Sequence, residues 1–354
     1  MSKNKWRPFQ SIPLQDKINF ARHLSVATKS GLSLMDSLRL IQQQTPSKTL
    51  ASVIDQLMRD VNNGQFLAES LEKYNHLFGE FFINIVRVGE TSGSLSDNLF
   101  YLAQELKKQK EINQKVRSAL IYPAVILVAT IGITIFLTFF IFPKILPIFV
   151  SLKVALPLST RILIAVLGFI TQRGFIILAA VFVLIISIKF ILQVKKIHYL
   201  FDRFLLSVPL VSNLIVDLTM VSFSRSLALL LKSGLTIIDA LSITKGTFHN
   251  LVYRKEVDKI IENVKKGEQI SSYLMTKPKL FPIMLSSMIR VGEETGNLQE
   301  NLFYLSEYYG GEIDDLVKNL TVVLEPLLLI IMGLIVGFVA ISIITPIYGV
   351  TQGL

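Results

Sequence analysis

Long apolar stretches alternate along this chain with amphipathic segments that carry charge. Residues 118–143 and 326–354 contain no charged side chain, and each stretch is long enough to cross about 30 Å of hydrocarbon as a helix. A third apolar region, 162–192, is interrupted by four more polar residues at 171–174. The remaining segments repeat apolar residues at helical spacing and show no period-two strand pattern. The pattern predicts an all-α membrane protein with large polar domains.

The polar segment before the first apolar stretch predicts six helices. We place them near residues 14–30, 33–44, 49–62, 65–73, 79–88 and 94–118. Ser33 and Asp36 have the spacing of a capping box, in which side-chain oxygens accept hydrogen bonds from the free amides of a helix start. No Gly or Pro lies between Leu95 and Tyr122, so the sixth helix is expected to continue into the membrane.

A block of about 124 residues occurs twice, at a constant offset of 203 and without gaps. The first copy is 20–143 and the second is 223–346. Each copy is a polar helical domain followed by a membrane segment, and each begins with Phe-x-Arg-x-Leu. Repetition of one supersecondary unit is typical of structural scaffolds.

The repeat also constrains the number of membrane spans. Two homologous polar domains are expected on one side of the membrane, so an even number of spans must separate them. We therefore predict one span, not two, in the third apolar region. The predicted order is a first polar domain (1–118), a first span (119–142), an external loop with an interfacial segment (143–172), a second span (173–192), a second polar domain (193–319), a third span (320–346) and an external tail (347–354).

Basic residues indicate the orientation. Those next to the first two spans are Lys107, Lys108, Lys110, Lys115, Arg117, Lys195, Lys196 and Arg203. The connection between these spans carries fewer, so we expect both polar domains and the N-terminus in the cytoplasm and the C-terminus outside. Residues 1–15 are polar and basic and predict no signal peptide.

The amino-acid composition favours some classes of binding partner and excludes others. Hydrophobic residues make up 51% of the chain and charged residues only 18%, with a net charge of +10. The first polar domain holds a basic surplus, which favours contact with anionic membrane lipids or, alternatively, with an acidic protein. No basic and aromatic residues cluster as in nucleic-acid-binding proteins, so direct nucleic-acid binding is not expected. The absence of cysteine excludes disulfides and thiolate chemistry.

Catalytic motifs are missing from the sequence. There is no phosphate-binding loop, no nucleophile elbow and no cluster of metal-binding carboxylates. The four histidines, His23, His76, His198 and His249, are scattered and not repeated between the copies. We therefore expect a non-enzymatic protein with no catalytic residue, no metal and no cofactor.

The most specific local motif is Gly-Glu-x-x-Gly-x-Leu. It comprises Gly89, Glu90, Gly93 and Leu95, and recurs as Gly292, Glu293, Gly296 and Leu298. The glycines and leucine fit a tight turn between two helices. The glutamate has three interpretations that the sequence leaves open: it binds amides of its own turn, it pairs with Arg22 (Arg225 in the second copy), or it contacts a partner protein.

Each membrane entrance carries a proline. Tyr122 and Pro123 occupy the first entrance, and Glu325 and Pro326 the third. We expect the prolines to kink the helices at the interface. Glu325 lies about one turn inside the third span. Two interpretations of this residue remain open: its charge has a function in the membrane, or its side chain simply reaches the water at the interface. Just before that span, Gly310-Gly311 predicts a kink or flexible joint.

These motifs, together with Lys29-Ser30-Gly31 and its second copy at 232–234, resemble the inner-membrane platform proteins of type II secretion systems and type IV pili. The family also includes the platform proteins of competence pseudopili. The resemblance implies a polytopic, homo-oligomeric scaffold in the bacterial cytoplasmic membrane. Its implied partners are a hexameric cytoplasmic assembly ATPase, pilin or pseudopilin subunits and other inner-membrane components of the machine.

An alternative is a repeat-containing transporter or channel subunit. Transporter repeats place broken helices and polar residues at the middle of the membrane. Here most of each repeat lies outside the predicted spans, which favours the scaffold.

Overall fold

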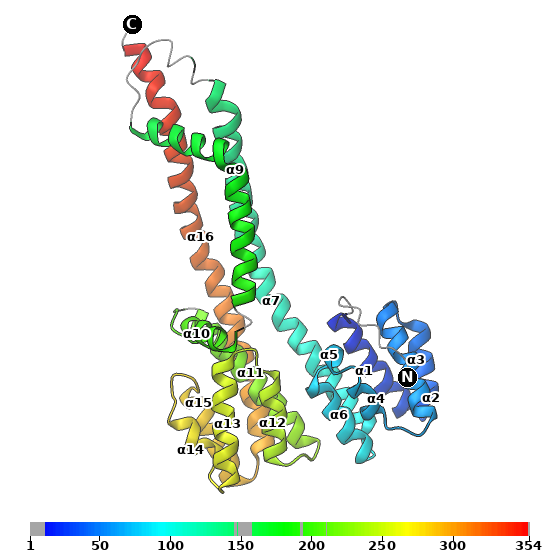
Figure 1. Cartoon of the computed structure of the whole chain (residues 1–354). Coiled ribbons are helices and arrows are strands. Elements are labelled where there is room, and N and C mark those ends of the chain that lie inside the picture. The colour runs from blue at the N-terminus through cyan, green and yellow to red at the C-terminus, as the bar shows by residue number, and fades with distance from the viewer. Residues whose placement is uncertain (1–10, 145–146, 148–157, 192–193, 210, 353–354) are drawn as a thin grey trace. The chain divides into compact units, whose positions relative to one another are not determined.

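The computed structural model describes residues 11–144, 147, 158–191, 194–209 and 211–352, and every regular element in these ranges is a helix (Figure 1). The predicted all-α class is therefore confirmed. The described residues form two compact units. The polar unit lies within 1–114 and 202–314, and the membrane unit lies within 115–201 and 315–354.

The first repeat domain, residues 11–114 of the polar unit, has the predicted order of helices. They are α1 (Leu14–Lys29), α2 (Leu34–Gln44), α3 (Lys48–Asn62), α4 (Leu67–Glu72), α5 (Asn75–Phe78), α6 (Glu80–Thr91) and the start of α7 (Leu95–Phe136). The sequence did not predict the single turn α5, which lies between two of the expected helices.

The second repeat domain, residues 211–314 of the polar unit, repeats this arrangement. Its helices are α11 (Val211–Lys232), α12 (Ile237–Thr247), α13 (Leu251–Lys265), α14 (Ile270–Met275), α15 (Ile283–Thr295) and the start of α16 (Leu298–Gln352). It is preceded by α10 (Lys195–Leu205), which lies before the second copy begins at residue 223.

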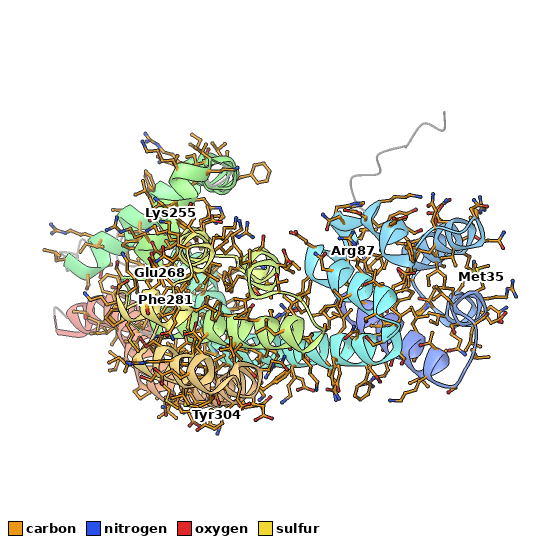
Figure 2. The ribbon with its side chains drawn as sticks, turned by 90° about the horizontal axis from the view of Figure 1, so that it is seen from below. Met35, Arg87, Lys255, Glu268, Phe281 and Tyr304 are labelled. Atoms are coloured by element: carbon orange, nitrogen blue, oxygen red, sulfur yellow. The ribbon has the colours of Figure 1, made fainter. Side chains whose placement is uncertain are left out.

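Aromatic residues at repeated positions form the two cores. Phe20 and Phe78 are buried in the first domain, with ring centroids 5.9 Å apart. Their counterparts Phe223 and Phe281 are buried in the second domain, where Phe281 also packs edge-on against Tyr253. Phe281 is labelled in Figure 2. Burying such large rings supplies much of the driving force for each bundle.

The capping motif forms in both copies. The hydroxyl oxygen of Ser33 accepts a hydrogen bond from the amide of Asp36 at 3.1 Å, and that of Thr236 accepts one from the amide of Asp239 at 3.2 Å. In each case the hydroxyl donates to the aspartate carboxylate at 2.6 Å and 2.7 Å respectively. The motif thus marks the start of α2 and of α12.

The membrane unit consists of long helices. α7 continues through the π-helical segment η1 (Leu137–Ile141) to Lys144, and α9 (Leu158–Ile191) runs unbroken through the more polar residues 171–174. Its 34 residues span about 50 Å at 1.5 Å per residue. The predicted external loop includes 145–146 and 148–157, which lie outside the described residues. In the predicted tail, α16 remains helical to Gln352.

Buried side chains join these helices. Phe142 packs with Leu163 and Leu167 of α9. The hydroxyl of Thr160 donates to the backbone carbonyl of Ser342 in α16 at 2.8 Å.

α16 continues through Gly310-Gly311 as an α-helix, so no loop separates the second repeat domain from the third predicted span. A kink or flexible joint at this point of the helix stays a prediction. Glycine costs about 1 kcal/mol relative to alanine inside a helix. The buried residues Tyr309 and Ile313 on either side secure this part of α16 to the core of the second domain, which offsets that cost.

Among the described residues, three helical segments are long and apolar enough to cross a membrane: Leu95–Lys144, Val211–Lys232 and Leu298–Thr345. The first and third contain predicted spans. The most apolar window of the second, α11, is 67% buried, against 17% for the others. We therefore assign α11 to the core of the second repeat domain. The predicted second span, 173–192, falls on α9 as far as Ile191, and residue 192 lies outside the described residues. The side chains of α9 are described only in part.

Candidate functional site

The signature motif forms the tight turn between the last two helices of each repeat domain. Gly89 lies in α6 where that helix touches α7: a Cβ atom at this position would lie 2.9 Å from Cα of Leu95. Gly292 is equally constrained, with 2.8 Å to Cα of Leu298. A real Cβ does not approach backbone so closely, so only glycine permits this helix contact.

Glycine is required at the second glycine position of the motif because of its backbone conformation. Gly93 and Gly296 have φ of +71° and +76°, in the left-handed region that side chains disfavour. Leu298 is buried and Leu95 half-buried just after the turn. Both glycines and the leucine thus serve the turn itself.

The glutamate of the motif binds a neighbouring helix. The two carboxylate oxygens of Glu90 accept hydrogen bonds from the amides of Leu67 at 2.6 Å and Ala68 at 3.0 Å, the first residues of α4. Phe66, which precedes α4, offers no side-chain cap. A carboxylate here satisfies free amides and complements the positive end of the helix dipole.

The second copy repeats this arrangement. Glu293 accepts from the amides of Ile270 at 2.6 Å and Ser271 at 3.1 Å, at the start of α14. These partners differ from the two internal ones expected from the sequence, the amides of the same turn and the Arg22 or Arg225 side chain. No local sequence pattern indicates these partners, because the capped amides lie 22 and 23 residues upstream of each glutamate.

Arg225 instead lies in the contact between the repeat domains. Its side chain is 8% exposed and forms ion pairs with Glu105 of α7 at 3.3 Å and Glu307 of α16 at 2.9 Å. Its counterpart Arg22 is exposed and lines the same cavity, of about 390 Å³, as Arg225, Glu105 and Glu307. The structure therefore brings the two repeated arginines to one polar cavity.

Glu105 is the most perturbed acid in this cavity. Burial raises the pKa of its carboxyl to about 7; the positive charge of Arg225 opposes the rise and the negative charge of Glu307 adds to it. Sequence repetition could not identify this residue, because its counterpart in the second copy is Tyr308.

Further contacts join α7 of the first domain to α11 of the second. The Ser233 hydroxyl donates to the side-chain oxygen of Asn98 at 2.9 Å. The Lys232 ammonium lies 4.0 Å from the ring centroid of Tyr101, a distance at which the ring face attracts a cation. Helix α12 also packs against α6. The contact therefore pairs α6–α7 of one repeat with α11–α12 of the other, and these are not equivalent faces.

The membrane-entry residues differ in exposure. Pro123 is the one buried residue of the four. The other three, Tyr122, Glu325 and Pro326, have exposed side chains. Both prolines lie inside continuous helices, α7 and α16. The signature residues belong to the polar unit and the membrane-entry residues to the membrane unit.

In the part of the chain that the structure describes, no group of three or more His, Asp or Glu side chains is arranged to hold a metal ion. The polar cavity contains Arg and Lys side chains beside its carboxylates. Its residues are suited to ion pairing between helices.

A model of a known protein family matches both copies of the duplicated block. The model of the family described as type II secretion system protein F matches residues 20–143 and again 223–346. The chain is 35% identical over 335 residues to the type IV pilus assembly protein PilC of Thermus thermophilus, covering 95% of this chain and 82% of that protein. It is 28% identical to the type II secretion system protein F of Vibrio cholerae, covering 96% and 83%. It is also 28% identical to the type IV pilus assembly protein TapC of Aeromonas hydrophila, covering 93% and 79%.

Proposed function

Because this chain belongs to the type II secretion system protein F family, we propose that it is the inner-membrane platform of a type IV pilus or of a secretion or competence pseudopilus. Its polar domains dock a hexameric cytoplasmic ATPase, and its spans contact pilin subunits. The chain itself is a scaffold, and the partner hydrolyses ATP. The observation that carries this proposal is the family match over both repeats, at nearly full length of the chain.

The helix architecture supports mechanical coupling. α7 runs from Leu95 to Phe136 and α16 from Leu298 to Gln352, each joining a repeat domain to an apolar membrane segment without a loop. An unbroken helix transmits displacement better than a flexible linker. Movement of either domain by a motor is therefore passed directly to a span.

The membrane unit offers a site for a pilin helix. An apolar groove of about 410 Å³ is lined by residues of α7, η1, α9 and α16, including Thr138, Leu163 and Phe338. The hydroxyls of Thr134 and Thr138 are buried and, within the described residues, have no hydrogen-bond partner. A membrane helix with one polar group facing these hydroxyls would satisfy them. We assign this groove to the transmembrane helix of a pilin.

The contact between the repeats also supports homo-oligomerisation. Val26 of α1 and Leu40 of α2 are 56% and 42% exposed, whereas their counterparts Leu229 and Ile243 in the second domain are 3% and 8% exposed. In the second domain this face, α11–α12, is covered by α6–α7 of the first. The first domain therefore displays an uncovered version of a face that binds a repeat domain.

The complementary face is exposed on the second domain. Tyr304 and Tyr308 of α16 are 53% and 39% exposed. Figure 2 labels Tyr304 on this helix. They are the counterparts of Tyr101 and Glu105, which contact α11. Joining unlike faces of successive molecules builds a ring or an open array. We propose that a second copy of the chain places its α1–α2 face on α15–α16 of the first.

Co-purification tests the platform role. Full-length chain isolated from a strain that assembles filaments should retain a hexameric ATPase and pilin-like proteins, and deletion of its gene should abolish filaments. Normal filaments in a deletion strain that has no paralogue would refute the proposal. A matched strain with only the membrane unit replaced should retain the ATPase and lose the pilin.

A further inference from the structure

Helix α10 displays an apolar stripe that the fold leaves exposed. Ile197, Leu200, Phe201 and Phe204 are 39%, 55%, 43% and 63% exposed. Their spacing of three, one and three residues places all four on one side of a helix. Large apolar side chains gathered in this way on a surface mark a contact with an apolar partner.

The other sides of α10 differ in kind. Asp202 is 6% exposed, and its carboxylate accepts a hydrogen bond from the amide of Leu251, the first residue of α13, at 2.7 Å. Lys195, Lys196 and Arg203 are exposed. One side is thus attached to the second repeat domain, another is basic, and a third is apolar.

The position of α10 along the chain indicates its partner. Its first residue follows the last residue of α9 by only four positions, and α9 contains the predicted second span. Four residues reach no more than about 14 Å, so α10 starts near the surface of the bilayer. A helix with an apolar side, a basic side and this location has the properties of interfacial membrane helices.

We propose that α10 lies along the membrane surface, with Ile197, Leu200, Phe201 and Phe204 at the boundary between headgroups and acyl chains. Lys195, Lys196 and Arg203 then contact anionic headgroups. The occupant of the apolar stripe is lipid.

This placement adds a second attachment between the second repeat domain and the bilayer. Asp202 joins α10 to the start of α13, so a helix held in the headgroup layer also holds α13 close to the membrane. Neither α10 nor Asp202 falls within the duplicated block, which starts at residue 223 in its second copy. The inference requires only that the chain is in a membrane. A test of α10 therefore does not depend on the proposed motor and pilin contacts.

The cysteine-free chain permits a direct test. Single cysteines replace Leu200 or Phe204 in the full-length protein, are labelled with a small fluorophore and are reconstituted in nanodiscs containing phosphatidylglycerol. Brominated acyl chains then quench only those labels that reach the lipid. Leu334→Cys, in the third predicted span, is the positive control. Lys266→Cys, one residue beyond the end of α13 remote from Asp202, is the negative control.

We expect labels at Leu200→Cys and Phe204→Cys to lose most of their fluorescence, as the Leu334→Cys label does, while the Lys266→Cys label stays bright. Replacing phosphatidylglycerol by phosphatidylcholine should weaken quenching at α10 and leave Leu334→Cys unchanged. Bright labels at both α10 positions beside a quenched Leu334→Cys label would overturn the proposal. Recovery of crosslinks from α10 to protein instead of lipid quenching would also overturn it, in favour of a protein partner.

Discussion

At the scale of single residues, the signature glutamates illustrate how a short motif can serve a distant element. Glu90 and Glu293 each bind two backbone amides at the start of a six-residue helix. Helices this short are marginal without such support. The carboxylate also connects the end of α6 or α15 to the helix it caps. The motif therefore joins three helices of each bundle.

Replacing Glu90 by Gln tests this role. Gln keeps the size of the side chain but removes the charge and one acceptor, so we expect a loss of about 1–3 kcal/mol of stability. Hydrogen exchange in the full-length protein should show faster exchange of the Leu67 and Ala68 amides. Glu294→Gln is the matched control, because Glu294 is exposed and pairs with Arg290 of its own helix. Unchanged exchange in Glu90→Gln would contradict the capping role.

Glu105 makes the contact between the repeat domains sensitive to pH. Its pKa is raised from 4.5 to about 7, chiefly by burial. The folded protein therefore binds this proton more tightly than the unfolded chain. The resulting stabilisation is complete below pH about 4.5 and is lost as the pH rises through about 7. Arg22, Arg225, Lys107, Lys108, Glu111 and Glu307 also line this cavity.

We expect Glu105→Gln to remove this part of the pH dependence, which amounts to something on the order of 3 kcal/mol between the two limits. Unfolding midpoints of the full-length protein in detergent, measured from pH 4.5 to 7.5, would record it. Glu111→Gln, which removes a carboxylate from the same cavity, should retain the wild-type slope. An unchanged slope in Glu105→Gln would show that this carboxyl does not carry the effect.

At the scale of helices and turns, sequence pattern predicted the elements better than their contacts. Apolar spacing and Ser33-x-x-Asp36 located the helices of the first domain, because these signals are local. The partner of Glu90 was missed since it lies on another helix, and the Arg225–Glu105 pair was missed since it links two domains. At Gly310-Gly311, local propensity predicts a kink or flexible joint, which stays a prediction, and packing of the buried Tyr309 and Ile313 keeps the helix continuous.

The same reasoning gives a prediction for that part of α16. Apart from the neighbouring backbone of α16 itself, a Cβ atom at Gly310 or Gly311 would meet no atom within 4 Å. The Gly310→Ala and Gly311→Ala variants should each gain up to about 1 kcal/mol and exchange their amides more slowly. By contrast, Gly292→Ala should lose about 1–3 kcal/mol because its Cβ would collide with α16. Loss of assembly with gained stability in the first pair would show that the glycines are needed for movement.

At the scale of the whole molecule, the duplication supplies two domains whose faces are alike in origin but differ in use. The α11–α12 face is covered by the first domain, while the equivalent α1–α2 face remains exposed. One chain thus contains both halves of a contact that successive chains could repeat. Duplication therefore provides a platform with a contact inside each chain and with a related exposed face for contact between chains.

Charge on the exposed face should break that assembly. We expect Val26→Asp and Leu40→Asp together to shift full-length protein in detergent from oligomer to monomer, as measured by native mass spectrometry. Met275→Asp is the control, because Met275 is 41% exposed but lies on neither proposed face. An unchanged oligomer mass for the double variant, with intact helical content, would contradict the head-to-tail contact.

The central claim is that this chain connects a cytoplasmic motor to pilins in the membrane. Photo-crosslinking in cells tests it most directly, with the crosslinker placed in turn at Phe66, Met275 and Phe338. Phe66 and Met275 are exposed positions of the two repeat domains outside the proposed contact between copies, and Phe338 lies in the membrane groove. We predict ATPase adducts from at least one of the two domain positions and pilin adducts from Phe338. Filament-producing cells that yield neither adduct, although all three variants support assembly, would contradict the account.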